Sequence, residues 1–273
     1  MSDLSSNANV KLRPVSGGRR FAMIRTIWAL MLREMSTTYG KTGGGYLWVI
    51  IEPVAGIALL TVVFSIIMRT PAIGVNFPIF YATGILMLGL YNEINNKLAK
   101  SLNFSRALLF YPAVTYIDAM IARVLVNLIT QFLVGFIIFS GIMIVWETRT
   151  DPQIDQILLA YMMAAALGIG IGTLNCVLFA LYPVWEKVWG ILNRPMFILS
   201  CIFFTFESVP QPFRDYLWYN PVVHVVGQMR KAMYHSYDAA YISHLYVFGI
   251  AGATTVLGLA LMLRYHRYIL NET

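Results

Sequence analysis

The chain has 273 residues, of which 58% are hydrophobic and only 12% are charged, whereas soluble domains carry about 25% charged residues. Its formal charge of +7 comes from basic residues scattered at the ends of apolar segments, which argues against a nucleic-acid partner because no basic patch forms. This surplus of apolar surface predicts a membrane protein. The two cysteines, Cys176 and Cys201, lie inside apolar runs and do not indicate a disulfide framework.

The N-terminal part of the chain divides into a tail and a helix. Residues 1–18 are polar and predict a flexible cytoplasmic tail rather than a cleavable signal peptide. Residues 19–42 place apolar side chains at helical spacing with basic ones largely elsewhere, which predicts an amphipathic helix in the membrane interface. Packing on a protein partner is the alternative, and both can hold. Glycines at 43–45 predict a hinge leading into the membrane.

Residues 43–273 predict a transmembrane domain with six spans, so the expected fold class is an all-α membrane protein. The spans are expected at about 46–68, 78–98, 113–146, 156–181, 188–206 and 244–263. Before the last span, residues 207–243 contain no uncharged run long enough to cross. They predict two short re-entrant helices, around 212–219 and 221–234, that dip into the outer leaflet and need shielding by protein.

Lys and Arg residues predict the orientation of these spans. Fourteen of them fall on the side of the two termini and five on the opposite side. Both termini are therefore predicted to be cytoplasmic, which agrees with an even number of spans.

The sequence contains no GxxxxGK[ST] nucleotide loop, no HExxH or CxxC motif and no GxSxG motif. The four histidines match no common metal spacing, so neither a metal nor a cofactor is predicted in this chain. Uphill movement of a substrate would need energy from another subunit or from an ion gradient. Glu52, Glu93 and Asp118 are candidates for an ion site, but each lies near a predicted cytoplasmic helix end, which favours ordinary polar networks.

Two further patterns concern packing and a substrate path. Gly168 and Gly172 form a GxxxG pair, which favours close helix contact within or between subunits. Aromatic residues make up 14% of the chain, and many of them suit interfacial belts. Others lie inside spans or in the outer segment, where aromatic faces can stack on sugar rings and form a path for a glycan. This second group is Phe80, Tyr81, Tyr91, Tyr161, Phe203, Phe204, Phe206, Trp218 and Tyr219.

Two segments resemble the permease subunit of ABC-type polysaccharide exporters. Residues 33–53, REMSTTYGKTGGGYLWVIIEP, share with that family Arg33, Tyr39, Gly45–Trp48 and Glu52–Pro53. Residues 216–230, YLWYNPVVHVVGQMR, share Asn220, Pro221 and Arg230. Length, predicted spans and the long outer segment agree as well, and the compact chain favours the capsule branch. One departure is that Lys41 alone stands where members often carry several basic residues.

The resemblance implies a channel-forming subunit, not an enzyme, of an ATP-driven exporter that moves lipid-linked capsular polysaccharide across the bacterial inner membrane. It implies a homodimer in contact with membrane lipids, two separate ATPase subunits that bind ATP and Mg²⁺, and a periplasmic co-polymerase or adaptor protein. The loop at 97–112 would dock on the ATPase through Asn103, Phe104, Arg106, Leu108, Leu109 and Phe110. The glycan and its linker would pass Arg33, Tyr39, Trp48, Phe80, Tyr81, Tyr91, Tyr161, Phe204, Trp218, Tyr219 and Arg230.

Other functions stay open at this point. The same permease class includes exporters of O-antigen, teichoic acid, other lipids and drugs. A membrane glycan polymerase or ligase would need a catalytic acid or base in an outward loop, for which Glu207, Asp215 and His224 are the candidates. An ion-coupled carrier is the third possibility.

Overall fold

The computed structural model describes residues 22–39, 44–102 and 115–272. Its helices are α1 (Ala22–Tyr39), α2 (Gly45–Ile67), α3 (Phe77–Ala99), α5 (Tyr116–Val145), α6 (Ile154–Leu181), α7 (Pro183–Asn193), α8 (Met196–Leu199), α9 (Phe213–Trp218), α10 (Pro221–Met233) and α11 (His244–Glu272). A single 3-10 turn, η1, occupies Phe206–Ser208. These residue ranges contain no strand, which confirms the predicted all-α fold class.

Four of these helices are long and apolar enough to cross a membrane. They are α2, α5, α6 and α11, with the spanning stretches Leu47–Ile67, Ile117–Val145, Ile154–Leu181 and His244–Tyr265. They coincide with the first, third, fourth and sixth predicted spans, although α11 continues to Glu272. Helix α3 coincides with the second predicted span, but its last turns carry polar residues from Asn92 to Lys97. The full number of six spans therefore stays a prediction.

The residues predicted as the fifth span, 188–206, do not form one helix. Helix α7 already begins at Pro183 and ends at Asn193, and α8 is a single turn. Pro195 lies at the break. It has no backbone N–H to donate and its ring crowds the preceding turn, so it interrupts the helix. Residues 200–205 then lead without regular helix to η1.

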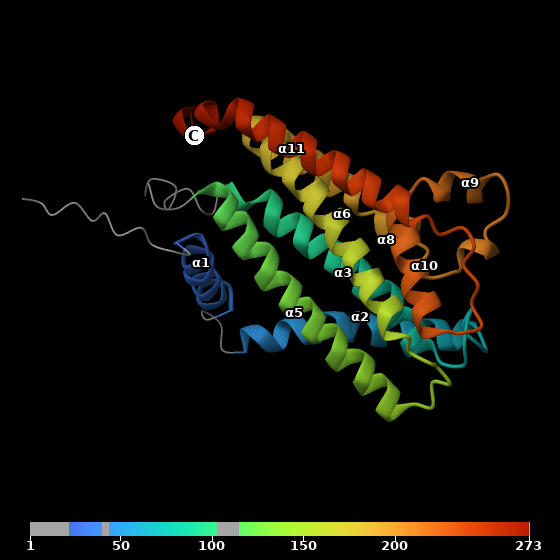
Figure 1. Ribbon diagram of the computed structural model, residues 1–273. Helices are drawn as coiled ribbons and strands as arrows, with labels where there is room; N and C mark the ends of the chain where they lie inside the picture. Colours follow the sequence, from blue (N-terminus) through green and yellow to red (C-terminus); the bar gives the residue numbers. More distant parts are fainter. Residues whose placement is uncertain (1–21, 40–43, 103–114, 273) are drawn as a thin grey trace, which may run out of the picture.

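Close packing holds α6 between α3 and α11, the two helices that it contacts most extensively (Figure 1). A Cβ atom added to Gly168 would lie 2.9 Å from the Cβ atom of Ile94 on α3. A Cβ atom added to Gly170 would collide with the carbonyl oxygen of Ala251 on α11. The GxxxG pair Gly168 and Gly172 therefore permits close packing on α3 within one chain. Gly170, which lies between them, permits close packing on α11, which the pattern did not predict.

Helices α1 and α2 lie at the edge of the molecule, and α2 runs across the long helices (Figure 1). Only 6% of the most apolar window of α2 is buried. Helix α1 packs Met31 against Ala122 and Val126 of α5 within the same chain. Its other face exposes apolar side chains, namely Met23, Ile24, Trp28, Leu32 and Met35. The position of that face in a membrane interface stays a prediction.

The bundle has two ends that differ in their elements. One end holds α1, the end of α3 and the start of α5, and the opposite end holds α9 (Figure 1). We call them the inner and the outer end, after the orientation predicted from the sequence. Helices α9 and α10 lie within the ranges predicted for short helices at 212–219 and 221–234. Asn220 begins α10, because its side-chain oxygen accepts a hydrogen bond from the N–H of Val222 at 3.0 Å and Pro221 suits the first helical position.

Protein covers α10 on most sides, as it packs against α6, α3 and α11. Such cover is what short helices within a membrane would need. Their re-entrant position stays a prediction.

We expect Gly170→Ala to destabilise the protein by about 1–3 kcal/mol, because the added methyl group meets the α11 backbone at Ala251 as well as the Thr254 hydroxyl group. The matched control is Gly252→Ala on α11, where nothing lies within 4 Å of an added Cβ atom. That control should be neutral or slightly stabilising, since alanine favours helix. Thermal unfolding of both variants in detergent measures the difference. If Gly170→Ala and Gly252→Ala unfold at the same temperature, the close contact between α6 and α11 is not needed for stability and the prediction is wrong.

Candidate functional site

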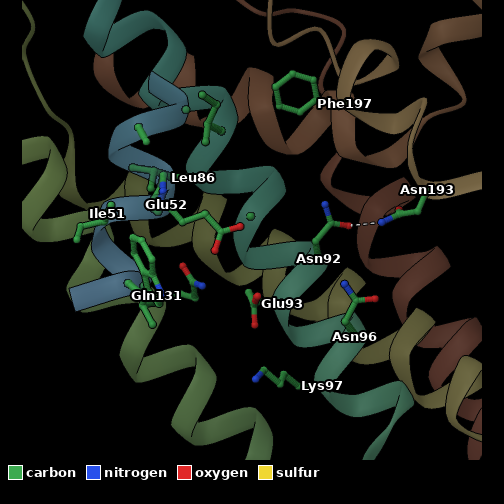
Figure 2. A pocket seen from close by; sticks show the side chains of 17 residues that line it. Ile51, Glu52, Leu86, Asn92, Glu93, Asn96, Lys97, Gln131, Asn193 and Phe197 are labelled. Carbon is green, nitrogen blue, oxygen red and sulfur yellow. Dashed lines mark hydrogen bonds between the residues drawn. The ribbon is translucent and has the colours of Figure 1, made fainter. Parts of the chain in front are cut away.

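An open cavity of about 850 Å³ lies between α2 and α3 and is bordered by Gln131 of α5, Asn193 of α7 and Phe197 of α8 (Figure 2). Its lining residues are Trp48, Val49, Ile51, Glu52, Pro53, Ala55, Gly56, Ile85, Leu86, Gly89, Asn92, Glu93, Asn96, Lys97, Gln131, Asn193 and Phe197. This volume falls within the range of about 300–1,000 Å³ that is typical of ligand sites.

The wall of this cavity is divided into an apolar part and a polar part. Helix α3 supplies apolar Ile85 and Leu86 two turns before it supplies Asn92 and Glu93. Residues on one helix face recur every three or four positions, so the same face changes from apolar to polar toward the inner end. The carboxylate of Glu52 on α2 points into the cavity together with that of Glu93 (Figure 2).

Amide hydrogen bonds hold the broken segment against α3. Asn193, the last residue of α7, donates from its Nδ2 atom to Oδ1 of Asn92 at 2.8 Å. Asn175 of α6 forms two further hydrogen bonds. It donates to Asn95 of α3 at 3.2 Å and accepts from the indole N–H of Trp185 of α7 at 3.1 Å. These hydrogen bonds position α7 against α3 and α6.

The predicted path residues do not gather around the cavity. Trp48 lines it and is 67% exposed. Phe80, Tyr81, Tyr91 and Tyr161 lie in the main hydrophobic core, each less than 5% exposed. In this conformation their faces contact protein, so their place on a substrate path stays a prediction. Of the seven polar lining residues, Glu52 and Glu93 were candidates for an ion site and the other five had no predicted role. The polar end of the second predicted span was a signal for Asn92, Asn96 and Lys97, whereas Gln131 and Asn193 had none.

Arg230 has a structural role that the sequence did not predict. Its side chain is buried, with 1% exposed, and donates to the carbonyl oxygens of Ile202 at 3.0 Å and Phe204 at 2.8 Å. The guanidinium carbon also lies 4.2 Å from the centre of the Phe80 ring. Arg230 thus satisfies backbone carbonyls in the irregular stretch after α8, which would otherwise lack partners.

A second cluster, at the outer end, centres on Trp218. Its indole N–H donates to the carbonyl oxygen of Tyr241 at 3.1 Å, and its ring lies 4.9 Å from that of Tyr246. His224 accepts from the N–H of Ser243 at its Nδ1 atom, at 3.2 Å. Its Nε2 atom, 2.8 Å from the carbonyl oxygen of Trp218, must therefore carry the proton and donate. Tyr219, the other predicted path residue here, remains 66% exposed.

These contacts bear on the two alternative functions. Both ring nitrogens of His224 are engaged by backbone, so this histidine does not present a free base. Asp215 accepts from Gln211 at 2.9 Å and Glu207 accepts from Tyr237 at 2.8 Å, so the three candidates do not form a catalytic group. Asp118 forms a capping box with Thr115 at the start of α5, as expected for a helix-end carboxylate.

A buried ion pair joins three helices at the inner end. The Nε atom of Arg123 on α5 lies 3.3 Å from Oε2 of Glu34 on α1, and its Nη1 atom donates to the carbonyl oxygen of Lys97 on α3 at 2.8 Å. The side chains of the pair are 6% and 9% exposed. Arg33, beside Glu34, is half-buried.

Some predictions concern residues outside the described part of the chain. The predicted ATPase-docking residues Asn103, Phe104, Arg106, Leu108, Leu109 and Phe110 all fall there, as does the side chain of Tyr39 at the end of α1. Within the described ranges, no group of three or more His, Cys, Asp or Glu residues could hold a metal ion.

Comparison with known proteins identifies relatives over most of the chain. The family model described as ABC-2 type transporter matches residues 25–234, from α1 to the end of α10. The chain is 33% identical over 236 residues to the polysialic acid transport protein KpsM of Escherichia coli, a match that covers 86% of this chain and 92% of that protein. It is 25% identical over 243 residues to the capsule polysaccharide export inner-membrane protein CtrC of Neisseria meningitidis, covering 89% and 92% of the two chains.

We expect Arg123→Met to destabilise the fold by about 3–5 kcal/mol, because it removes the guanidinium group that contacts the buried Glu34 carboxylate and the carbonyl oxygen of Lys97. The double variant Glu34→Met with Arg123→Met should lose less than the single variant, since an apolar pair needs no charge compensation. Thermal unfolding of both proteins in detergent gives the comparison. A double variant that is less stable than Arg123→Met alone would contradict this account.

Proposed function

The chain belongs to the ABC-2 type transporter family, and we propose that it is the membrane subunit of an ATP-driven exporter of capsular polysaccharide in the bacterial inner membrane. The observation that carries this proposal is the 33% identity to KpsM over 92% of that protein's length. The name of KpsM refers to transport of polysialic acid, and that of CtrC to capsule polysaccharide export. The substrate class is therefore a capsular glycan, and its lipid-linked form is part of the proposal.

The energy for export comes, in this proposal, from two separate ATPase subunits that bind ATP and Mg²⁺. The sequence has no nucleotide-binding loop of its own, and a partner must therefore supply hydrolysis. Residues 97–112 join α3 to α5 on the predicted cytoplasmic side, where such a partner would dock. Arg123, which pairs with Glu34, donates a hydrogen bond to the carbonyl oxygen of Lys97 near the α3 end of this connection.

The assembly that we propose is a homodimer with six spans per chain, both termini in the cytoplasm and a periplasmic adaptor at the outer end. The apolar face of α2 supports a lipid or protein neighbour, because only 6% of its most apolar window is fully buried within one chain and Leu59, Val62 and Ile66 are exposed. The exposed apolar face of α1 supports a place in the membrane interface.

The cavity between α2 and α3 forms part of the substrate path in this proposal. It lies among the proposed spans, and its polar part continues toward the inner end, where a substrate from the cytoplasm would enter. The glycan polymerase or ligase is not favoured by a comparable observation, since the outer carboxylates and His224 are separately engaged by neighbouring groups. Among the candidates for an ion-coupled carrier, Asp118 caps the start of α5.

We expect Gly89→Trp to abolish most of the export while leaving the protein folded in the membrane. Gly89 lines the cavity, and nothing lies within 4 Å of a Cβ atom added there, so the indole can enter the empty space. The measurement is the ratio of surface to intracellular capsular polysaccharide, detected with an antibody before and after permeabilisation of the cells.

The control for this test is Gly141→Trp on α5, which is equally open but does not line the cavity. It should export normally. Normal export by Gly89→Trp would remove the cavity from the path, and unchanged surface capsule in cells that lack the whole chain would refute the proposed function itself.

A further inference from the structure

We propose that His224 is a pH-sensitive switch at the outer end, which holds α9 against α10 and α11 while it is neutral and releases α9 when it takes up a second proton. This role does not depend on what the chain exports, because it concerns only how α9 is held. It belongs to a buried histidine that the proposed function leaves unused.

Helix α9 lies at the edge of the outer end (Figure 1). None of its six residues is buried, and Phe213 and Tyr216 are 65% and 73% exposed. Its contact with the body of the protein is at its last residue, Trp218, whose indole N–H donates to the carbonyl oxygen of Tyr241 at 3.1 Å. The position of α9 therefore depends on the groups around Trp218.

His224 joins this end of α9 to the start of α11. The side chain is 0% exposed. Its Nε2–H donates to the carbonyl oxygen of Trp218 at 2.8 Å, and its Nδ1 atom accepts from the N–H of Ser243 at 3.2 Å. Ser243 in turn accepts at its hydroxyl oxygen from the N–H of Tyr246 in the first turn of α11, at 3.3 Å. One imidazole thus connects three elements, and it does so only as the neutral tautomer with its proton on Nε2.

A second proton on His224 breaks this connection. Both ring nitrogens of an imidazolium are donors, so Nδ1–H would face the N–H of Ser243, which is also a donor. The positive charge would in addition be buried, and a buried charge is costly unless it is paired. His224 therefore takes up the proton only when the segment around it opens to water.

The groups that contact His224 do not compensate a positive charge. Neither of its two hydrogen bonds within the described ranges is to a carboxylate. The rings of Tyr241 and Tyr246 lie 5.9 Å and 5.4 Å from its ring. A charge on His244 of α11 would oppose a charge on His224, and Arg230 further along α10 is itself a buried cation.

Carboxylates on the surrounding elements are engaged elsewhere or exposed. Asp155 of α6, Glu207 of η1 and Asp215 of α9 accept hydrogen bonds from Gln156, Tyr237 and Gln211. Asp238, in the segment before α11, is exposed. Tyr81 of α3 and Cys201 after α8 are the remaining titratable groups on this side, and both are uncharged near neutral pH.

The direction of the pH effect follows from proton binding. A histidine in contact with water has a pKa of about 6.5, so below that pH the released state binds one proton more than the held state. The held state is therefore fully stable above about pH 6.5 and loses stability as the pH falls. One such group shifts the equilibrium toward release by about tenfold between about pH 7.5 and about pH 5.5.

Hydrogen–deuterium exchange of the full chain in lipid nanodiscs tests the switch. Mass spectrometry measures the exchange at about pH 7.5 and about pH 5.5, and each rate is divided by that of an unfolded peptide at the same pH. We expect the protection of residues 213–219 to fall about tenfold at the lower pH, while that of α3 stays constant. Equal protection of residues 213–219 at the two pH values would overturn the proposal.

His224→Asn removes the titration, because an amide oxygen can accept from Ser243 at both pH values. Protection of residues 213–219 should be lower than in the wild type at the higher pH, since the bond to Trp218 is lost, but equal at the two pH values. His224→Gln, whose amide N–H can donate to Trp218, is the second variant, and gel filtration checks that each is folded. A pH dependence that persists in a folded His224 variant would refute the assignment.

His235→Asn and His244→Asn are the matched controls at the same end of the molecule. Both histidines are exposed, and their hydrogen bonds are to the side chains of Gln153 at 3.3 Å and Gln228 at 3.0 Å. Each control should keep the tenfold change, because neither histidine bonds to α9. Loss of the change in either control would mean that the switch is not His224.

Discussion

The arrangement of this protein depends on how closely α6 approaches α3 and α11. The glycines on α6 carry no side chain that would hold these helices apart. Within lipid, such close packing drives helix association in place of the hydrophobic effect. The contact fixes α3 with its apolar part beside the core and its polar end beside α7. It also gives α10 a surface on which to pack. The cavity lies between α2 and the α3 helix that this packing has positioned.

Charged and polar groups inside the protein are treated in two different ways. Arg230 and Arg123 are buried, and both reach backbone carbonyls or a carboxylate, so their role is to hold irregular or converging segments together. Glu52, which is exposed, and Glu93, which is half-buried, instead line the open cavity. Buried groups of the first kind need hydrogen bonds to the protein, whereas carboxylates at an exposed wall can be hydrated.

Much of the fold could be predicted from the sequence, because long apolar runs and helical periodicity are local properties. The positions of α2, α3, α5, α6 and α11 agree with predicted spans to within a few residues, except at the start of α5 and the end of α11. The helices α9 and α10 also lie where prolines predicted them. The break after Asn193 was missed, since the surrounding residues are apolar enough to suggest one span.

The sequence by itself determined the class of the molecule, the polar end of α3 and the glycines that permit close packing, because each is a matter of composition and spacing along one segment. Only the tertiary structure decided which polar residues share a space. Asn92 and Asn193 are about a hundred positions apart in the chain, and their meeting depends on how α7 turns back against α3. The tertiary structure likewise placed Arg230 beside the irregular segment after α8, where its guanidinium group donates to the carbonyl oxygens of Ile202 and Phe204.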